Sequence, residues 1–138
     1  MKQVLSIEQM QHLQELGLDT SDASMYWARV SHGSSIDDKS KSKWFLSLHK
    51  EFQTCGFMSY ESIPTYTLQD ILDKLPCFIG KEVLTIQKLA DSYTCLYIEP
   101  YTRSMINITE SKEPIDAAYD MLCWCIENGY VKIGKEEQ

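Results

Sequence analysis

One stretch, residues 113–131, constrains the fold of this chain more than any other, because its helix signals are nearly complete. Pro114 suits the first helical position, where a missing N–H costs nothing, and Gly129 suits the turn just past the end. Apolar side chains at a spacing of about 100° per residue fall on one side: Ile115, Ala118, Leu122, Cys125 and Ile126. Acidic residues fall on the other side. We therefore expect this helix to lie with its apolar stripe against a sheet.

The cysteines do not form a recognisable chemical motif. There are five of them, and two, Cys123 and Cys125, lie within the predicted helix. Residues two apart on a helix point about 160° away from each other, so this pair is poorly placed to bind one metal ion. No Cys-x-x-Cys spacing occurs, and an odd number of thiols does not suit a disulfide framework. The pattern predicts reduced thiols, with Cys125 in the core, and neither a metal site nor another cofactor.

Composition points to a globular, acidic protein. The 138 residues suit a single domain, residues 1–138, in which 43% of the residues are hydrophobic. A net charge of −7 disfavours binding to the phosphate backbone of nucleic acids. No apolar run approaches the about 20 residues of a membrane helix, and the first residues lack the apolar segment of a signal peptide. We therefore expect a cytoplasmic protein that binds no membrane.

Two further helices are marked by their first residues. Ser6 and Gln9 have the spacing of a capping box, and Gly17 lies where that first helix must end. Thr67 and Asp70 repeat the capping-box spacing ahead of a second helix. Apolar residues recur at helical intervals in both segments, so each helix should have one buried side.

The residues between these two helices suggest short strands. Residues 25–30 and 44–49 alternate and are rich in aromatic side chains, which is typical of strands. The polar stretch 31–43 between them predicts a flexible loop. This loop contains the basic cluster of the chain: Lys39, Lys41 and Lys43. A solvated hairpin tip and an anion site both fit that cluster. Residues 57–60 predict a short edge strand, in a region that Pro64 closes.

The clearest sheet signal lies in the second half of the chain. Residues 83–89, 93–99 and 105–109 predict three consecutive strands joined by short turns. We expect one face of this sheet to carry Leu84, Ile86, Leu96, Ile98, Ile106 and Ile108. That face should receive the helix of residues 113–131. The polar tail, residues 134–138, is expected to be disordered.

Known catalytic and nucleotide-binding motifs do not occur in the sequence. Only six glycines are present, and none forms a dinucleotide-binding or phosphate-binding loop. The side chains that remain for a thiol catalyst are His12, His32, His49 and Cys55. The carboxylates that share a helix face are Asp116, Asp120 and Glu127, a spacing more typical of a solvated surface than of a catalytic pair. We predict no catalytic residue, and keep a cryptic Cys/His or carboxylate site as the alternative.

Aromatic residues supply the one candidate site. Tyr93 and Tyr97 lie on a predicted strand, and Trp27 and Trp44 on the first hairpin. Such side chains bury much area with little loss of entropy and are enriched in contact surfaces. The four residues therefore form a candidate interaction surface, with a second small core as the alternative interpretation.

Two stretches resemble a known family. Residues 64–76 match the pattern Pro-x-x-Thr-Leu-x-x-Ile/Leu-Leu-x-x-Leu-Pro, and residues 124–130 read Trp-x-Ile-Glu-Asn-Gly-Tyr. Together with the opening helix, they are similar to a family of small uncharacterised bacterial proteins often encoded on prophages and other mobile elements. The resemblance implies an accessory role in such an element and implies no catalytic residue.

These observations predict an α+β fold, with an antiparallel sheet of about five strands and about three helices packed mainly on one face. The predicted function is that of a non-catalytic interaction module that binds a protein partner or a second copy of itself. The alternative is a small enzyme with a cryptic site.

Overall fold

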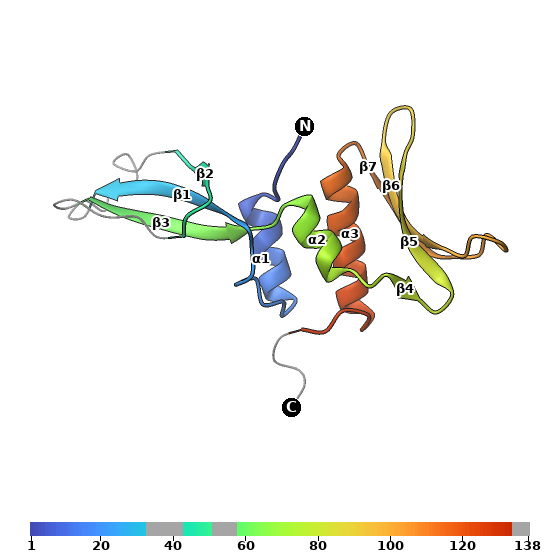
Figure 1. Ribbon diagram of the computed structural model, residues 1–138. Coiled ribbons are helices and arrows are strands. Elements are labelled where there is room, and N and C mark those ends of the chain that lie inside the picture. The colour runs from blue at the N-terminus through green and yellow to red at the C-terminus, as the bar shows by residue number, and fades with distance from the viewer. Residues whose placement is uncertain (33–42, 51–57, 134–138) are drawn as a thin grey trace.

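The structure, a computed structural model, describes residues 1–32, 43–50 and 58–133 (Figure 1). The helices are α1 (Ile7–Glu15), α2 (Leu68–Lys74) and α3 (Pro114–Glu127). The strands are β1 (Met25–His32), β2 (Phe45–Ser47), β3 (Met58–Thr65), β4 (Phe78–Ile79), β5 (Glu82–Lys88), β6 (Tyr93–Ile98) and β7 (Met105–Ser111). The α+β class and the three helices are therefore confirmed.

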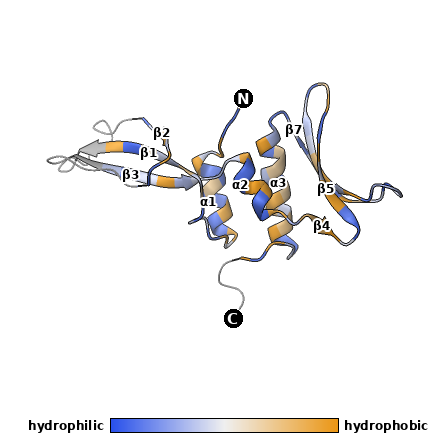
Figure 2. Cartoon of the chain, in the orientation of Figure 1, coloured by the Kyte–Doolittle hydropathy of each residue, from blue (hydrophilic) through white to orange (hydrophobic). Residues whose placement is uncertain are grey.

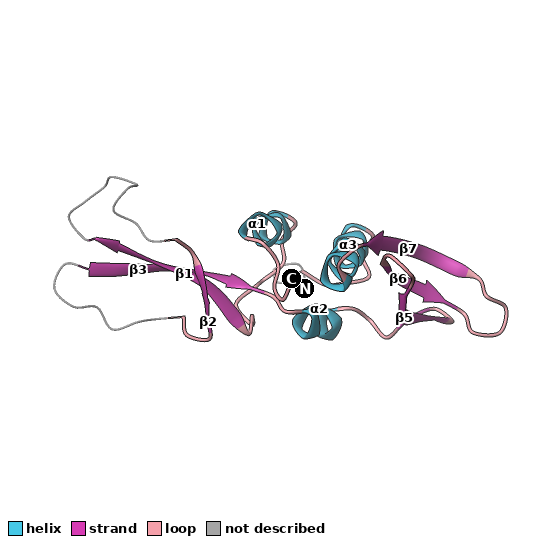
Figure 3. Cartoon of the chain, turned by 90° about the horizontal axis from the view of Figure 1, so that it is seen from above, coloured by secondary structure: helices cyan, strands magenta, loops and turns pink. Residues whose placement is uncertain are grey.

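The strands divide between two antiparallel sheets instead of forming one. The first sheet has the order β2-β1-β3, and the second has the order β4-β5-β6-β7. Figure 1 shows the helices gathered between the two sheets, and the view from above in Figure 3 shows the same arrangement. The main core lies among the helices and one face of the second sheet. Its fully buried side chains include Leu5, Met10, Leu13, Ile71, Ile115, Met121 and Leu122.

Two predictions fall on parts of the chain that the structure does not describe. Residues 33–42 of the expected loop 31–43 lie outside the described residues, and so does the tail 134–138. The first two residues of the expected loop belong to β1, which runs to His32. The strand is therefore longer than the sequence predicted.

Local hydrogen bonds explain where the first two helices begin and end. Ser6 Oγ accepts from the Gln9 N–H at 3.1 Å, and Gln9 Oε1 accepts from the Ser6 N–H at 2.9 Å. Gly17 then takes a φ of 102°, and the N–H of Leu18 bonds back to the carbonyl of Leu13 at 3.1 Å. The helix α2 begins with a reciprocal cap of the same kind. The capping residues predicted from the sequence are thus confirmed.

The longest helix, α3, is buried on two sides. Its apolar residues face the second sheet on one side and α1 and α2 on the other, as the hydropathy colours of Figure 2 suggest. Gly129, with φ of 82°, ends it as predicted. Within the described segments, none of the helices combines the length and apolar composition needed to cross a membrane. The predicted packing of this helix against a sheet is confirmed.

A polar cluster ties the first residues of the chain to α1 and α3. Lys2 Nζ donates to Asp116 Oδ1 and to Gln9 Oε1, both at 2.8 Å. Gln9 Nε2 donates to the same Asp116 oxygen at 3.0 Å. One of the carboxylates expected on a solvated helix face therefore contributes to the packing of the two helices.

The first sheet is attached to the helices at one end only. The carbonyl of Leu5 accepts from Thr65 Oγ1 at 2.8 Å and from Trp27 Nε1 at 2.9 Å. The strand β3 runs on through Pro64 to Thr65, so the prediction that this proline closes the strand region was wrong. An edge strand tolerates proline because its free side needs no N–H donor.

The second sheet corrects the predicted pairing of its faces. In the observed register Leu84 lies opposite Tyr97, which lies opposite Asn107. Residues directly opposite share a face. The row with Leu84 therefore faces α3, whereas Leu96 and Ile108 lie opposite each other on the other face. Ile98 and Ile106 lie on that other face too, so the expectation that these four residues receive the helix was wrong.

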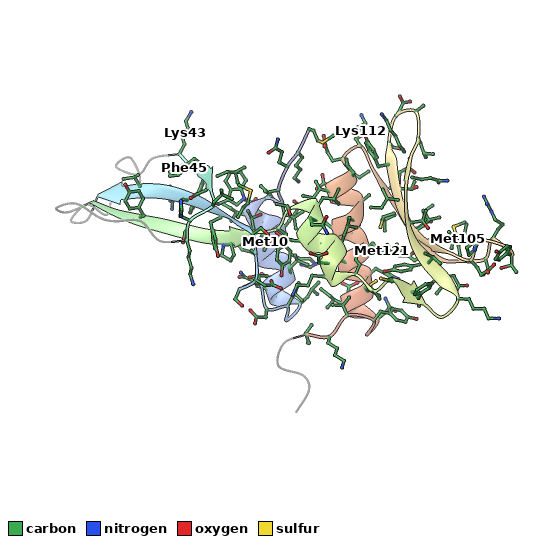
Figure 4. The ribbon with its side chains drawn as sticks, viewed as in Figure 1. Met10, Lys43, Phe45, Met105, Lys112 and Met121 are labelled. Atoms are coloured by element: carbon green, nitrogen blue, oxygen red, sulfur yellow. The ribbon has the colours of Figure 1, made fainter. Side chains whose placement is uncertain are left out.

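Polar side chains of β7 also contact the helix that covers that face. Thr109 Oγ1 donates to the carbonyl of Ala117 in α3 at 2.7 Å. Asn107 Nδ2 lies 3.7 Å from the sulfur of Met121. Figure 4 shows Met121 between α3 and the sheet, while Met105 lies farther from the helix. The covered face thus carries polar groups that the helix satisfies, and isoleucines are left on the opposite face.

Candidate interaction surface

The structure does not bring the four predicted aromatic residues together. Trp27 lies in β1 and Trp44 directly precedes β2, so both belong to the first sheet. Tyr93 and Tyr97 lie in β6 of the second sheet. The three helices separate the two sheets (Figure 1), so the four side chains cannot form one contact surface.

Tyr97 lies in the core and is not exposed to solvent. Its ring is fully buried, and its hydroxyl donates to the carbonyl of Pro76 at 2.6 Å. Burial, with the nearby Cys125 and Cys95, raises the pKa of this tyrosine above its ordinary value. Tyr93, four residues before Tyr97 on the same face of the strand, is half-buried. This face of β6 therefore serves folding.

The two tryptophans also have partners within the chain. Trp27 is half-buried and, with Leu46 and the first residues of the chain, lines a shallow hollow of about 420 Å³. Arg29 lies 4.3 Å from the centre of the Trp44 ring and pairs with Glu61 at 3.1 Å. The cation covers the indole face that a partner would otherwise contact.

An apolar surface that the sequence analysis did not recognise lies on the second sheet. We call it the open sheet face: Val83, Thr85, Leu96, Ile98, Ile106 and Ile108. Within the described residues no helix packs on it, because α3 occupies the opposite face (Figure 3). The β7 side chains are the most accessible, with Ile106 36% and Ile108 49% exposed.

An irregularity in β7 enlarges this face. The register shifts between Tyr97 and Ile98, so that Met105 and Ile106 both lie beside Ile98. Met105 is 52% exposed. Three large apolar side chains of one strand are therefore accessible to solvent, which is uncommon for a solitary domain surface.

The open sheet face is also poor in charge. Its six residues carry none, although 24% of the chain is charged. The nearest acidic group on the same side of β7 is Glu110, whose carboxylate accepts from Ser92 Oγ at 2.6 Å. An apolar, uncharged sheet face with polar residues around it has the anatomy of the centre of a protein–protein interface.

Three of the described cysteines, Cys95, Cys123 and Cys125, are poor nucleophiles. Burial is the main cause that raises the pKa of Cys123 and of Cys125 to about 11, and that of Cys95 to about 12. Near neutral pH these groups are therefore thiols and not the reactive thiolates. His49 is exposed, and Cys55, its proposed partner, lies outside the described residues. Among residues 1–32, 43–50 and 58–133, no His, Cys, Asp and Glu side chains group as metal ligands.

A polar hollow beside α2 is explained by contacts within the chain. The Tyr66 hydroxyl donates to Asp22 at 3.0 Å, and Lys74 forms an ion pair with the same aspartate. Asp70 accepts from the N–H of Ser24 at 3.1 Å while it caps α2. These charged groups bind one another and hold the start of β1 against α2.

Comparison of the chain with protein-family models, with curated proteins and with solved structures finds no match. The site must therefore be interpreted from its own geometry.

Proposed function

We propose that this protein is a non-catalytic interaction module that binds a protein partner through the open sheet face. The observation that carries the proposal is that Ile106 and Ile108 project from β7 on the side that α3 does not cover. Each Å² of apolar surface removed from water contributes about 25 cal/mol, so a partner that covers these side chains gains affinity directly.

The chemistry of the face specifies the kind of partner. The face is apolar, uncharged and built on strands, so it suits a flat apolar surface of another protein. It offers no lysine or arginine to phosphate groups, which, with the net charge of −7, argues against nucleic acid. The three accessible β7 side chains are flexible Met and branched Ile, which pack against many apolar shapes.

The proposed setting is the cytoplasm of a bacterium, in the service of a prophage or another mobile element. Two sequence motifs support this setting, namely residues 64–76 and the end of α3. Both motifs contribute to the fold: the first contains the α2 cap, and the second contains the turn at Gly129. The resemblance thus supports a context, and the open sheet face supports the activity.

The experiment compares affinity capture from cells of the native host by three forms of the chain. Ile106→Lys with Ile108→Lys places two charges on the open sheet face, and Leu48→Lys is the control. Leu48 is 70% exposed and directly follows β2 of the first sheet. Burying an unpaired charge costs more than about 1.4 kcal/mol, so the double variant should lose partners more than tenfold.

The native chain and the Leu48→Lys control should recover the same partners. Thermal unfolding of all three forms shows whether they are folded, since each substituted side chain is exposed. Equal recovery by the folded double variant would contradict the proposal.

A further inference from the structure

The two sheets expose four edge strands within the described residues, and three of these edges are poorly suited to pairing. The strand β2 has three residues and β4 has two. The strand β3 contains Pro64, which lacks an N–H donor, and beyond its end the N-terminal segment bridges Val4 to Thr67. Short strands, prolines and covering segments are the means by which proteins prevent edge-to-edge association.

The fourth edge, β7, lacks these protections. It runs for seven residues, Met105–Ser111, with β6 on one side and no further described strand on the other. Its sequence from Met105 to Thr109 holds no proline and no charged residue. Its irregular pairing is confined to its first residues, opposite Ile98. A seven-residue edge whose one charged residue, Glu110, lies near its end is a template for another strand.

We propose that β7 pairs antiparallel with β7 of a second copy of this chain, so that two four-stranded sheets join into one. The inference rests on the proposed function. It names a second copy of this chain as a partner of β7, the strand that carries the exposed Ile106 and Ile108 of the open sheet face. Because Ile108 is the middle residue of the strand, pairing about it aligns all seven residues. Ile108 then lies opposite Ile108 of the second copy, and both open sheet faces point to the same side.

Local charge does not oppose a second copy on this edge, despite the net charge of −7. In the centred register Glu110 lies opposite Ile106 of the second copy. The two Glu110 carboxylates are then four residues apart along the ladder, about 13 Å, which exceeds the screening length of about 10 Å at 0.1 M salt. No like charges lie directly opposite each other, so the repulsion that weakens strand pairs is absent from the pairing.

Area explains what the pairing adds to the proposed function. Three full-length strands of about seven residues present a face of roughly 14 Å by 20 Å, on the order of 300 Å². A standard interface needs about 800 Å² from each partner. Two copies joined at β7 double the open sheet face without dividing it, and the strand hydrogen bonds supply affinity that the face alone lacks.

The test uses a single cysteine at the centre of the pairing. Ile108→Cys places two thiols opposite each other, at the Cα separation of about 5 Å that a disulfide requires. Leu48→Cys is the control, because that side chain is also exposed but directly follows β2 of the first sheet. Under mild oxidation the 108–108 disulfide, identified by peptide mapping, should form at least about tenfold faster than the 48–48 disulfide.

Sedimentation of the native chain completes the test. Its mass should rise with concentration from 16.0 kDa towards twice that value. A chain that stays at 16.0 kDa at high concentration would overturn the pairing, and so would equal rates of disulfide formation at positions 108 and 48. The proposed function is tested separately by the capture experiment. It stands if the Ile106→Lys with Ile108→Lys variant loses partners, even when the chain does not pair with itself, and it fails if that variant keeps its partners.

Discussion

Each of the two sheets has a face that no described helix covers, yet these two faces differ in character. On the first sheet, Arg29 stacks on Trp44 and pairs with Glu61, so these three side chains already have partners within the chain. On the second sheet, the uncovered row holds Leu96, which is buried on a central strand, and Ile108, which is 49% exposed at the edge. An uncovered face is therefore not in itself a binding surface. What marks the second face is that no element among the described residues covers the apolar side chains of β7.

The largest expected effect separates the two faces of the second sheet. Met121→Ala, a fully buried side chain of α3 beside Asn107 of β7, should lower the free energy of unfolding by about 2–5 kcal/mol, because it leaves a cavity in a close-packed core. Ile108→Ala, on the open sheet face, should cost less than about 1 kcal/mol in the monomer. Urea unfolding at low protein concentration measures both values. Equal losses would show that the two faces contribute equally to folding.

An intermediate effect tests how the first sheet is attached. Thr65→Val keeps the shape of a fully buried side chain but removes its hydrogen bond to the Leu5 carbonyl. We expect a loss of about 1 kcal/mol, since that oxygen keeps its bond from Trp27. Thr85→Val on the second sheet is the matched control, because the Thr85 hydroxyl bonds only within its own strand. A control loss as large as that of Thr65→Val would contradict the special role of this anchor.

The smallest effect concerns the charged row of the first sheet. Arg29→Met removes both the contact with the Trp44 ring and the pair with Glu61, and should cost about 0.5–1 kcal/mol. The cost should shrink at high salt, because both groups are partly exposed. Urea unfolding at two salt concentrations measures it. An effect that does not depend on salt would show that Arg29 acts through packing of its aliphatic part.

Local signals in the sequence predicted much of this fold. The caps at Ser6 and Thr67 and the helix-ending glycines all lie where the sequence placed them, because each depends on atoms a few residues apart. The strands β5, β6 and β7 were also predicted within two residues of their ends. Local hydrogen bonds and turn geometry are encoded locally, so a single sequence is enough to find them.

The candidate surface was missed because strand pairing is not a local property. Along β6, apolar or aromatic side chains occur on both faces, so alternation alone does not tell which face is buried. Asn107 and Thr109 look like surface residues, yet α3 satisfies them on the covered face. A usable signal in the sequence is that the face with Tyr97 also carries Cys95 and Asn107, a mixture of apolar and polar side chains that suits a face covered by a helix.

The most direct test of the proposed β7 pairing is amide hydrogen exchange of the native chain at two protein concentrations. The account predicts that β7 amides exchange more slowly at the higher concentration, while amides of β3, the long edge strand of the first sheet, do not change. Unchanged exchange in β7, or an equal change in both edge strands, would contradict it.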